Sequence, residues 1–391
     1  MAFVVALAAA GCDSGGGSSD APPAVPFTAV ELPAGSVPAV LAPAGEALLI
    51  GARRDGGPEL LRRGPDGAIA AVPVHGLTPY GREAAWHSIT TDGGRVVAIG
   101  GERGGAHGNV RWSAWTGSAE AGITEQPQAF STFGGWGAGD LVDAVLTPVG
   151  PALVGTWQST QVGFDVAVWT ADGDTWVRQS SAGTALVSSR GSLGFPMAAT
   201  GMENGILVVG WQLAGGRQQA VVWRSDSGNT GWTATPLPQN GKAGSAIAVG
   251  CRGPVCDVTG WVDGTLAVWR LADGEWTQLA GVPPIAVGDR DRLAAPVELD
   301  GRPAVVVSDG GRVKLVRAPG RTDGQADGSA GGSAGGHADG SAVGGRWTVR
   351  DVTGPTGAIT AMTVVGDAVY LLAAPDENTG TVWRADLASL R

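Results

Sequence analysis

Short apolar runs recur along nearly the whole chain, and they come in pairs on either side of a glycine. Seven segments share the order of an apolar run, a glycine-centred turn and a second apolar run. Runs of this length, bounded by Gly, Pro, Asn or Asp, are typical of antiparallel strands. The turn glycines are Gly45, Gly93, Gly150, Gly205, Gly253, Gly301 and Gly366. They lie 48, 57, 55, 48, 48 and 65 residues apart, which indicates one repeating unit.

A second hairpin follows each of these segments. Its clearest copies run from Val166 to Trp176, from Ala220 to Trp232 and from Leu266 to Trp276, with weaker copies at 59–67, 110–117 and 313–317. Asp-Gly between alternating strands is a strong hairpin signal. Two hairpins per repeat, in a repeat of about 50 residues, match one four-stranded blade of a β-propeller. We therefore predict an all-β, seven-bladed β-propeller, with six or eight blades as the alternatives.

The two ends of the repeat region predict a closed ring. The seventh repeat stops after its third strand, 381–385, so its fourth strand is missing. The segment 27–33, which precedes the first repeat, is similar to the fourth strands that begin at Trp232 and Trp276. We expect this N-terminal strand to complete the last blade, because closure protects sheet edges that would otherwise pair with other chains. The predicted propeller domain is 27–391.

The long step between the last two repeats has a local cause. Residues 319–345 are rich in Gly, Ala, Ser and Asp and hold almost no large apolar side chain, so they cannot bury a core. They fall between the predicted third and fourth strands of blade six. Asp-x-Gly spacing in this insertion faintly resembles calcium-binding glycine repeats, but no nonapeptide period is sustained. We predict a flexible insertion.

The first residues predict export. An apolar run over 1–11 ends in Ala9-Ala10-Gly11-Cys12, and a Gly/Ser-rich stretch follows. This junction resembles the lipobox of bacterial lipoproteins, which implies a signal peptide over 1–11, a diacylated Cys12 and a flexible tether over 12–26. The basic segment usual at the start is missing, which leaves a start further upstream open. The alternative is a frayed apolar terminus with an incidental cysteine. We expect a protein anchored to the outer face of the bacterial cell membrane.

The other two cysteines, Cys251 and Cys256, stand on either side of a Gly-Pro turn. They would face each other across a hairpin, and an exported protein meets conditions that allow a disulfide. A metal site would need further ligands, and neither His nor Cys lies near in the sequence. We predict a disulfide between Cys251 and Cys256.

The Trp–turn–Trp hairpins resemble degenerate Asp-box repeats of sialidase-like propellers. The matches are centred on Asp172, Asp226 and Asp273, all with altered spacing. Gly-Trp after second strands, as at 210–211 and 260–261, is similar to kelch repeats. The resemblance covers almost all of the chain after Thr28, and it implies the fold but not the chemistry. It also implies that the three aspartates cap outer turns and are structural.

Composition narrows the picture further. The chain has 66 Gly and 15 Trp but only two Tyr, and 26 basic against 36 acidic residues give a net charge of -10. Few strong helix formers argue against a helical protein, and the acidic balance argues against a nucleic-acid partner. We expect a monomer without cofactor or metal. Twelve Trp fall at repeat positions and predict packing between blades: Trp115, Trp157, Trp169, Trp176, Trp211, Trp223, Trp232, Trp261, Trp269, Trp276, Trp347 and Trp383.

The expected functional surface is one mouth of the central channel, formed by the loops between blades and the turns between second and third strands. These loops carry aromatic and charged side chains in the early blades, a mixture that suits a sugar or a peptide. For each single residue the alternative is packing over the mouth. The candidate binding residues are Tyr80, Glu83, Trp86, His87, Glu102, Arg103, Phe130, Phe133, Trp136, Asp140, Arg190 and Arg290.

Two functions remain open on the sequence. The first is a membrane-anchored binding or scaffold module for a glycan or protein partner, which we expect rather than catalysis. The alternative is a divergent, exported, sialidase-like glycoside hydrolase. A sialidase-like site needs a Tyr nucleophile, but Tyr370 is expected in the core and only Tyr80 lies in a loop. Glycoside hydrolysis needs two convergent carboxyl groups, and the candidates are Glu83, Glu102, Asp140 and Glu298.

Overall fold

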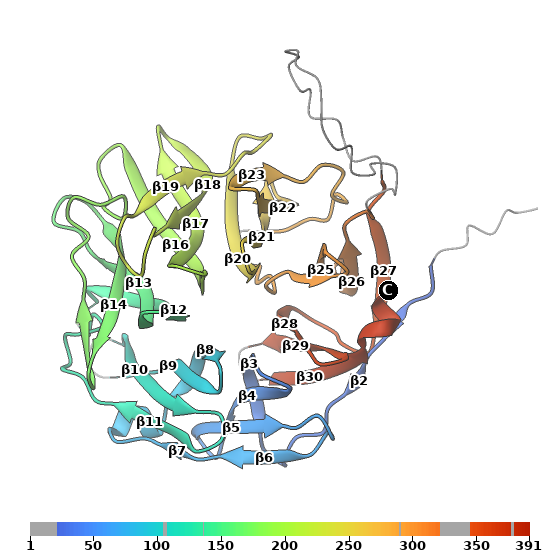
Figure 1. Ribbon diagram of the computed structural model, residues 1–391, viewed down its shortest axis with the longest axis horizontal. Helices are drawn as coiled ribbons and strands as arrows, with labels where there is room; N and C mark the ends of the chain where they lie inside the picture. Colours follow the sequence, from blue (N-terminus) through green and yellow to red (C-terminus); the bar gives the residue numbers. More distant parts are fainter. Residues whose placement is uncertain (1–21, 105–107, 136, 289–290, 321–344, 377–378) are drawn as a thin grey trace, which may run out of the picture.

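The computed structural model describes residues 22–104, 108–135, 137–288, 291–320, 345–376 and 379–391. Seven antiparallel sheets lie around a common centre, as Figure 1 shows, so the fold prediction of an all-β, seven-bladed propeller is confirmed. The strands of each blade follow the chain from the inner to the outer side, except that β1, β2 and β7 are added at the outer edges of blades 6, 7 and 2. Within the described residues no helix is long and apolar enough to cross a membrane.

The strands of the first four blades follow the predicted repeats. Blade 1 consists of β3 (Val37–Ala44), β4 (Ala47–Arg54), β5 (Gly57–Arg63) and β6 (Ile69–Val72). Blade 2 consists of β8 (Ala85–Asp92), β9 (Arg95–Arg103), β10 (Val110–Ser118) and β11 (Gly122–Gln126), with β7 (Val74–His75) parallel to β11. Blade 3 consists of β12 (Gly139–Thr147), β13 (Gly150–Gln158), β14 (Phe164–Asp172) and β15 (Thr175–Arg178). Blade 4 consists of β16 (Ser192–Gly201), β17 (Ile206–Ala214), β18 (Arg217–Arg224) and β19 (Thr233–Pro236).

The remaining blades include the ring closure. Blade 5 consists of β20 (Gly244–Arg252), β21 (Val255–Val262), β22 (Thr265–Ala272) and β23 (Glu275–Gln278). Blade 6 consists of β24 (Val297–Leu299), β25 (Arg302–Asp309), β26 (Arg312–Arg317) and β27 (Thr348–Thr353), with β1 (Val25–Pro26) parallel to β27. Blade 7 consists of β28 (Ile359–Val365), β29 (Ala368–Asp376), β30 (Thr379–Asp386) and β2 (Thr28–Ala29). Two short helices are α1 (Pro79–Arg82) and η1 (Leu387–Leu390).

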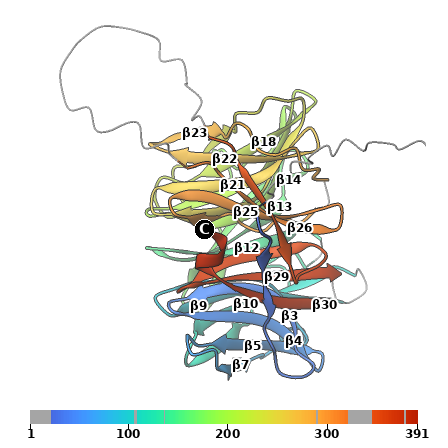
Figure 2. The ribbon, with the colours of Figure 1, turned by 90° about the vertical axis from the view of Figure 1, so that its right-hand side faces the viewer.

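The N-terminal segment closes the ring, as predicted, but it does so in two steps. β2 pairs antiparallel with β30 and supplies the missing fourth strand of blade 7. The preceding β1 pairs with β27 of blade 6, so strand pairing begins two residues before the predicted boundary at Phe27. Between the two strands the chain changes sheets at Phe27, whose N–H donates to Thr353 O at 2.9 Å. The views in Figures 1 and 2 both place this blue segment against the red C-terminal strands.

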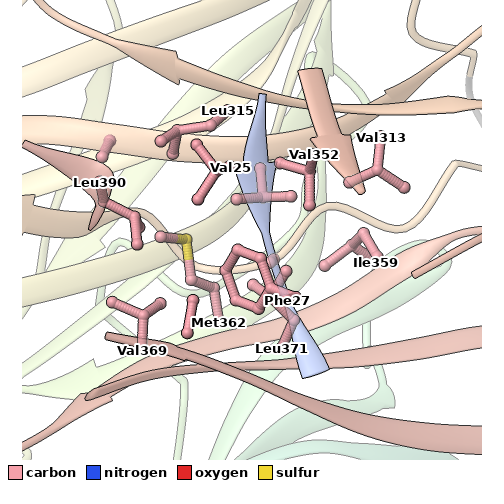
Figure 3. Packing of buried hydrophobic residues seen from close by; sticks show 14 of the residues in the cluster. Val25, Phe27, Val313, Leu315, Val352, Ile359, Met362, Val369, Leu371 and Leu390 are labelled. Atoms are coloured by element: carbon pink, nitrogen blue, oxygen red, sulfur yellow. The ribbon is translucent and has the colours of Figure 1, made fainter. Parts of the chain in front are cut away.

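The side chains of Val25 and Phe27 enter the core between blades 6 and 7. Figure 3 shows them among Leu315, Val352, Met362 and Leu371, and both are buried. The backbone comes close here because Gly354 has no side chain: a Cβ at Gly354 would lie 2.5 Å from Phe27 O, and its φ is +111°. The same Cβ would lie 2.7 Å from the Trp383 ring, so Gly354 lets both the N-terminal segment and Trp383 come close.

Arg350 ties both ends of the chain to blade 6. Its Nε donates to Pro23 O at 2.9 Å, and its Nη1 donates to Ser389 O at 2.8 Å. Leu390 of the C-terminal turn is buried in the same core as Phe27. The first and last described parts of the chain are thus both held against blade 6.

The disulfide prediction agrees with the structure. Cys251 and Cys256 lie opposite each other on β20 and β21 and are joined by a disulfide. β26 and β27, which flank the predicted insertion in the sequence, pair with each other. Residues 321–344 themselves lie outside the described residues, as does Cys12 with its flanking segment.

Tryptophans at repeat positions pack between the blades. Trp115, Trp169 and Trp269 on third strands are fully buried. The indole N–H of Trp169 donates to Thr132 O at 2.8 Å, and that of Trp269 donates to Pro238 O at 2.6 Å. Both acceptors lie in the connection from the preceding blade. The indole therefore satisfies a loop carbonyl while its ring fills the space between sheets.

We predict that Phe27→Ala lowers the free energy of unfolding by about 3–5 kcal/mol, because it empties a buried aromatic site at the ring closure. Urea unfolding followed by tryptophan fluorescence measures this change. Glu31→Ala, an exposed position four residues further on, is the control and should alter stability by less than about 0.5 kcal/mol. Equal losses in the two variants would contradict the role of Phe27.

Candidate functional site

The inner strands share one irregularity at the same level of the channel. In six of the seven blades the pairing of the first and second strands shifts by one residue, which marks a β-bulge. Each bulge leaves one inner-strand residue without a ladder partner and re-aims its side chain. These residues are Ala39, His87, Val142, Met197, Ile247 and Thr360. The inner strands all begin at the same end of the channel, and we call this end the upper mouth.

The second strands make room for the bulges. A Cβ at Gly155 would lie 2.0 Å from Asp140 O, and one at Gly210 would lie 2.1 Å from Phe195 O. Gly260 is equally close to the backbone of Ser245. The glycines that precede Trp211 and Trp261 in the sequence thus let the inner strand approach, which explains the recurring Gly-Trp pattern.

Two predicted residues, His87 and Asp140, come together at the upper mouth. Both contact Trp112, which the sequence did not single out. The His87 ring meets the Trp112 ring edge to face, with 5.1 Å between centroids. Trp112 Nε1 donates to Asp140 Oδ1 at 2.9 Å. Blades 2 and 3 therefore join one imidazole, one indole and one carboxylate into a cluster, which we call the mouth cluster.

His87 is held in its neutral form. His87 is exposed, yet desolvation by the surrounding protein lowers its pKa from the usual value. The nearby Arg292 lowers the pKa as well, whereas a hydrogen bond with the Val142 backbone and the charge of Asp140 act in the opposite direction. At neutral pH the ring offers polar contacts without a charge.

Asp143 lies beside this cluster and joins the inner strands of three blades. Ser88 Oγ of blade 2 donates to Asp143 Oδ1, and Ala199 N of blade 4 donates to Asp143 Oδ2 at 3.0 Å. Ala144 N also donates to Oδ1, at 3.1 Å. Burial raises the pKa of Asp143 to about 6, although these three hydrogen bonds favour the carboxylate. The residue holds the wall of the channel together.

Exposed apolar side chains gather around the same mouth. Among the described residues eight large apolar side chains are exposed, and six of them lie on the upper side or in the channel lining of blades 2–4. These six are Leu77, Tyr80, Phe130, Phe164, Met197 and Leu213. Val149 lies in a turn on the opposite side and Val177 on an outermost strand. We call the six residues the upper apolar surface.

Several aromatic rings on this side are already covered by the protein. The Arg178 guanidinium lies 4.6 Å from the centroid of Trp157, and that of Arg111 lies 4.4 Å from the centroid of Phe130. Phe195 and Trp211 stack on each other with 3.8 Å between centroids. Few flat ring faces therefore remain free to stack on a ligand.

The rim residues before blade 2 are positioned by a buried acid. Glu125 accepts hydrogen bonds from the N–H groups of Leu77 and Thr78, each at 2.7 Å, and from the Thr78 hydroxyl. Thr78 in turn caps α1, where its Oγ1 accepts from Gly81 N at 2.9 Å. This arrangement holds Tyr80 at the rim, against Gly104, and leaves Glu83 exposed.

The other charged candidates lie apart from the mouth cluster. Glu102 pairs with Arg53 at 3.3 Å, and Arg103 donates to Gly108 O. Arg190 is exposed in the connection into blade 4, which the buried Asp165 fixes by accepting from Ser188 N at 2.8 Å. Glu298 lies near the other end of the channel wall, where it pairs with Arg252 and Arg270.

Two candidates are buried inside the protein. Trp86 and Phe133 are buried, so a ligand at the mouth does not reach them. Trp86 donates its N–H to Glu59 O at 2.8 Å, and Phe133 packs edge to face on Trp169. Both belong to the packing between blades. Trp136 and Arg290 lie outside the described residues.

Comparisons with known proteins identify the fold and no family. No family model matches the chain, and no curated protein matches it either. Among solved structures, a puromycin hydrolase mutant matches 94% of this chain and 56% of its own, at 16% identity and a TM-score of 0.54. YCF48 bound to D1 peptide matches 93% of this chain and 99% of its own, at 11% identity and a TM-score of 0.51. A sialidase from Trypanosoma rangeli matches 90% and 60%, at 11% identity and a TM-score of 0.42.

We predict that the stability of the protein falls as the pH rises from about 4 to about 6. The folded state holds a proton on Asp143 up to about pH 6, whereas an unfolded Asp loses it near pH 4. Over this window the folded state binds more protons, so rising pH favours unfolding, by up to about 3 kcal/mol in total. Asp143→Asn should remove this part of the pH dependence.

Urea unfolding at a series of pH values measures the effect. Burial also raises the pKa of Asp257 to about 6. Asp257 therefore still contributes to the pH dependence of unfolding in the Asp143→Asn variant. Ser88→Ala is a second variant: without the hydroxyl the pKa of Asp143 rises further, and the window extends to higher pH. An unchanged slope in Asp143→Asn would contradict this account.

Proposed function

We propose that this protein is an exported, membrane-anchored binding or scaffold module that holds a protein partner at the upper mouth of its propeller. The observation that carries the proposal is the one-sided placement of exposed apolar side chains on blades 2–4. Exposed apolar surface of this kind, next to a few polar groups, is typical of interaction sites. The mouth cluster supplies the polar groups, with His87 neutral and Asp140 accepting from Trp112.

The same surface favours a polypeptide over a glycan. Carbohydrates pack on free aromatic faces, but here Arg178 covers Trp157 and Arg111 covers Phe130. Three of the six exposed side chains, Leu77, Met197 and Leu213, are not aromatic, and Met197 in the channel lining is flexible enough to adapt to a peptide side chain. YCF48, a propeller chain of similar extent, is solved with a bound peptide, so this fold can present a peptide surface.

The alternative, a sialidase-like glycoside hydrolase, finds less support. Of the four candidate acids, Glu102 already pairs with Arg53, and Glu298 pairs with two arginines near the other end of the channel wall. Asp140 accepts from Trp112, and Glu83 stands on the rim after α1. Three of the four carboxyl groups thus have different partners, which suits binding better than paired acid catalysis.

The membrane anchor rests on the Ala9-Ala10-Gly11-Cys12 junction. Two acyl chains on Cys12 would give stable attachment, since each buried CH₂ contributes about 0.8 kcal/mol. The tether would then join the propeller at the strand crossing of Val25 and Phe27, away from the inner strands. This placement leaves the upper mouth free for a partner.

We predict that peptides selected against the protein bind the upper apolar surface. A displayed peptide library is panned on the immobilised chain, and the recovered peptides are measured by fluorescence anisotropy. Met197→Glu with Leu213→Glu should weaken binding at least about tenfold, because charges replace exposed apolar contacts. Val149→Glu places the same change on the opposite side and serves as the matched control.

Equal affinity for the double variant and the Val149→Glu control would contradict the proposed surface. A glycan array run in parallel distinguishes the two ligand classes. Binding to sugars but to no peptide would show that the partner is a glycan and not a protein. Sugar release that disappears in Asp140→Asn would favour the hydrolase.

We predict that Cys12 carries the anchor. Cells grown with labelled palmitate should label the protein and retain it in the membrane fraction, whereas Cys12→Ser should be unlabelled and released. Cys251→Ser with Cys256→Ser keeps Cys12 and should stay labelled. Labelling that survives Cys12→Ser would show that the acyl chains are attached elsewhere.

A further inference from the structure

Two adjoining cavities open at the junction of blades 7 and 1, which we call the seam, away from the upper mouth. The first has a volume of about 510 Å³ and lies between the N-terminal strand, blade 7 and blade 1. The second has a volume of about 430 Å³ and lies between the turns of blades 7 and 1. Both are lined by Arg63, Gly67 and Arg384. Volumes of this size accommodate a small ligand.

Three donor groups meet where the two cavities adjoin. Arg63 Nη1 donates to the Tyr370 hydroxyl oxygen at 2.6 Å, and the Arg63 guanidinium lies 5.5 Å from the Tyr370 ring centroid. Arg384, on the neighbouring strand β30, also hydrogen-bonds the Tyr370 hydroxyl. The Tyr370 ring is buried between blades 7 and 1, so only its hydroxyl end meets the cavity. The hydroxyl accepts from the arginines and keeps its own O–H to donate.

Arg63 lacks an ion-pair partner among the described residues, although Glu31 also lines the first cavity. Among the ion pairs of the described residues none involves Arg63, whereas Arg384 pairs with Asp386 at 2.8 Å. Glu46, Asp66 and Asp367 border the second cavity, but none of them pairs with Arg63. Asp66 is already engaged, since its Oδ1 accepts from Ala68 N at 3.1 Å. A half-buried guanidinium in this position still has donors to offer.

The backbone at Gly67 packs against the Arg63 guanidinium. Its φ is +87°, a conformation that favours glycine, and a Cβ there would lie 3.0 Å from Arg63 Nη2. The backbone of the β5–β6 turn thus lies directly against the guanidinium. The turn and Tyr370 hold the group from two sides, which reduces the entropy lost when it binds a ligand.

From this geometry we propose that the seam binds a phosphate-type oxyanion, with Arg63 as the main contact and Arg384 and Tyr370 as further donors. A planar guanidinium binds such an anion through two parallel hydrogen bonds, and a second guanidinium shares the charge. The anion is either free phosphate or the headgroup of an acidic lipid, because the two share this chemistry. The site is separate from the upper mouth and does not depend on the function proposed for it.

The test uses the full chain with Cys12→Ser, so that no acyl chain attaches to Cys12. Inorganic phosphate is titrated at constant ionic strength and followed by calorimetry, with Arg63→Met and Arg62→Met as matched variants. Arg62 precedes Arg63 on β5, so its side chain points to the other face of the sheet and away from the cavities. We expect saturable binding that Arg63→Met weakens at least about tenfold and Arg62→Met leaves unchanged.

Two further arms complete the experiment. Flotation with vesicles of phosphatidylcholine alone, and of phosphatidylcholine and phosphatidic acid four to one, separates the sources of the anion. Arg63-dependent binding to the acidic vesicles assigns a lipid headgroup, and Arg63-dependent binding of phosphate alone assigns the free ion. If Arg63→Met does not fold, Arg384→Met replaces it, with circular dichroism as the check. Absence of saturable binding to both phosphate and the acidic vesicles, or equal affinities in the Arg63 and Arg62 variants, would overturn the proposal.

Discussion

Closure of the ring by the N-terminal segment is the constraint on which the rest of the structure depends. A propeller that ended at β30 would leave an open edge on blade 7, and open strand edges pair with other chains. β2 covers that edge, while β1 attaches the same segment to blade 6. Phe27 lies between the two strands and fills the core that blades 6 and 7 share. A stretch of five residues thus joins the two blades through both backbone and side chains.

The geometry of the channel follows from this closure. Because the blades form one ring, the bulges of their inner strands lie around one axis, and His87 and Asp140 from different blades share Trp112 at the upper mouth. Hydrogen bonds to the Asp143 carboxyl group join three inner strands. Burial of this carboxyl group raises its pKa. Two surfaces with different chemistry result: an apolar one around the upper mouth, and a polar one at the seam, where Arg63 and Arg384 flank Tyr370.

The sequence was sufficient for the fold because the repeat is encoded in local signals. Glycine-centred turns, Asp-Gly hairpins and the missing fourth strand of the last repeat predicted seven blades and the closure. Cys251 and Cys256 were predictable for the same reason, since a short hairpin brings them opposite each other. The sheet change at Phe27 was not predictable, because two-residue strands leave no periodicity to detect.

The candidate site was predicted only in part. The loops of the early blades pointed to His87 and Asp140, but nothing in the sequence marked Trp112 or Asp143 as their neighbours, because those contacts join separate blades. Trp86 and Phe133 were expected near a ligand, yet burial between sheets depends on tertiary packing that loop composition does not reveal. The Gly-Trp pairs at 210–211 and 260–261 could have predicted the inner-strand bulges, since their glycines lie against the backbone at these bulges.

Amide hydrogen exchange at the N-terminal segment tests the closure most directly. The N–H of Phe27 donates to Thr353 O, and the N–H of Val30 donates to Val382 O at 2.8 Å. If these bonds close the ring, both amides exchange as slowly as the core amides of β29 and β30, at the rate of global unfolding. Exchange of Phe27 and Val30 at the rate of a frayed terminus, while β29 stays protected, would show that the propeller holds together without this segment.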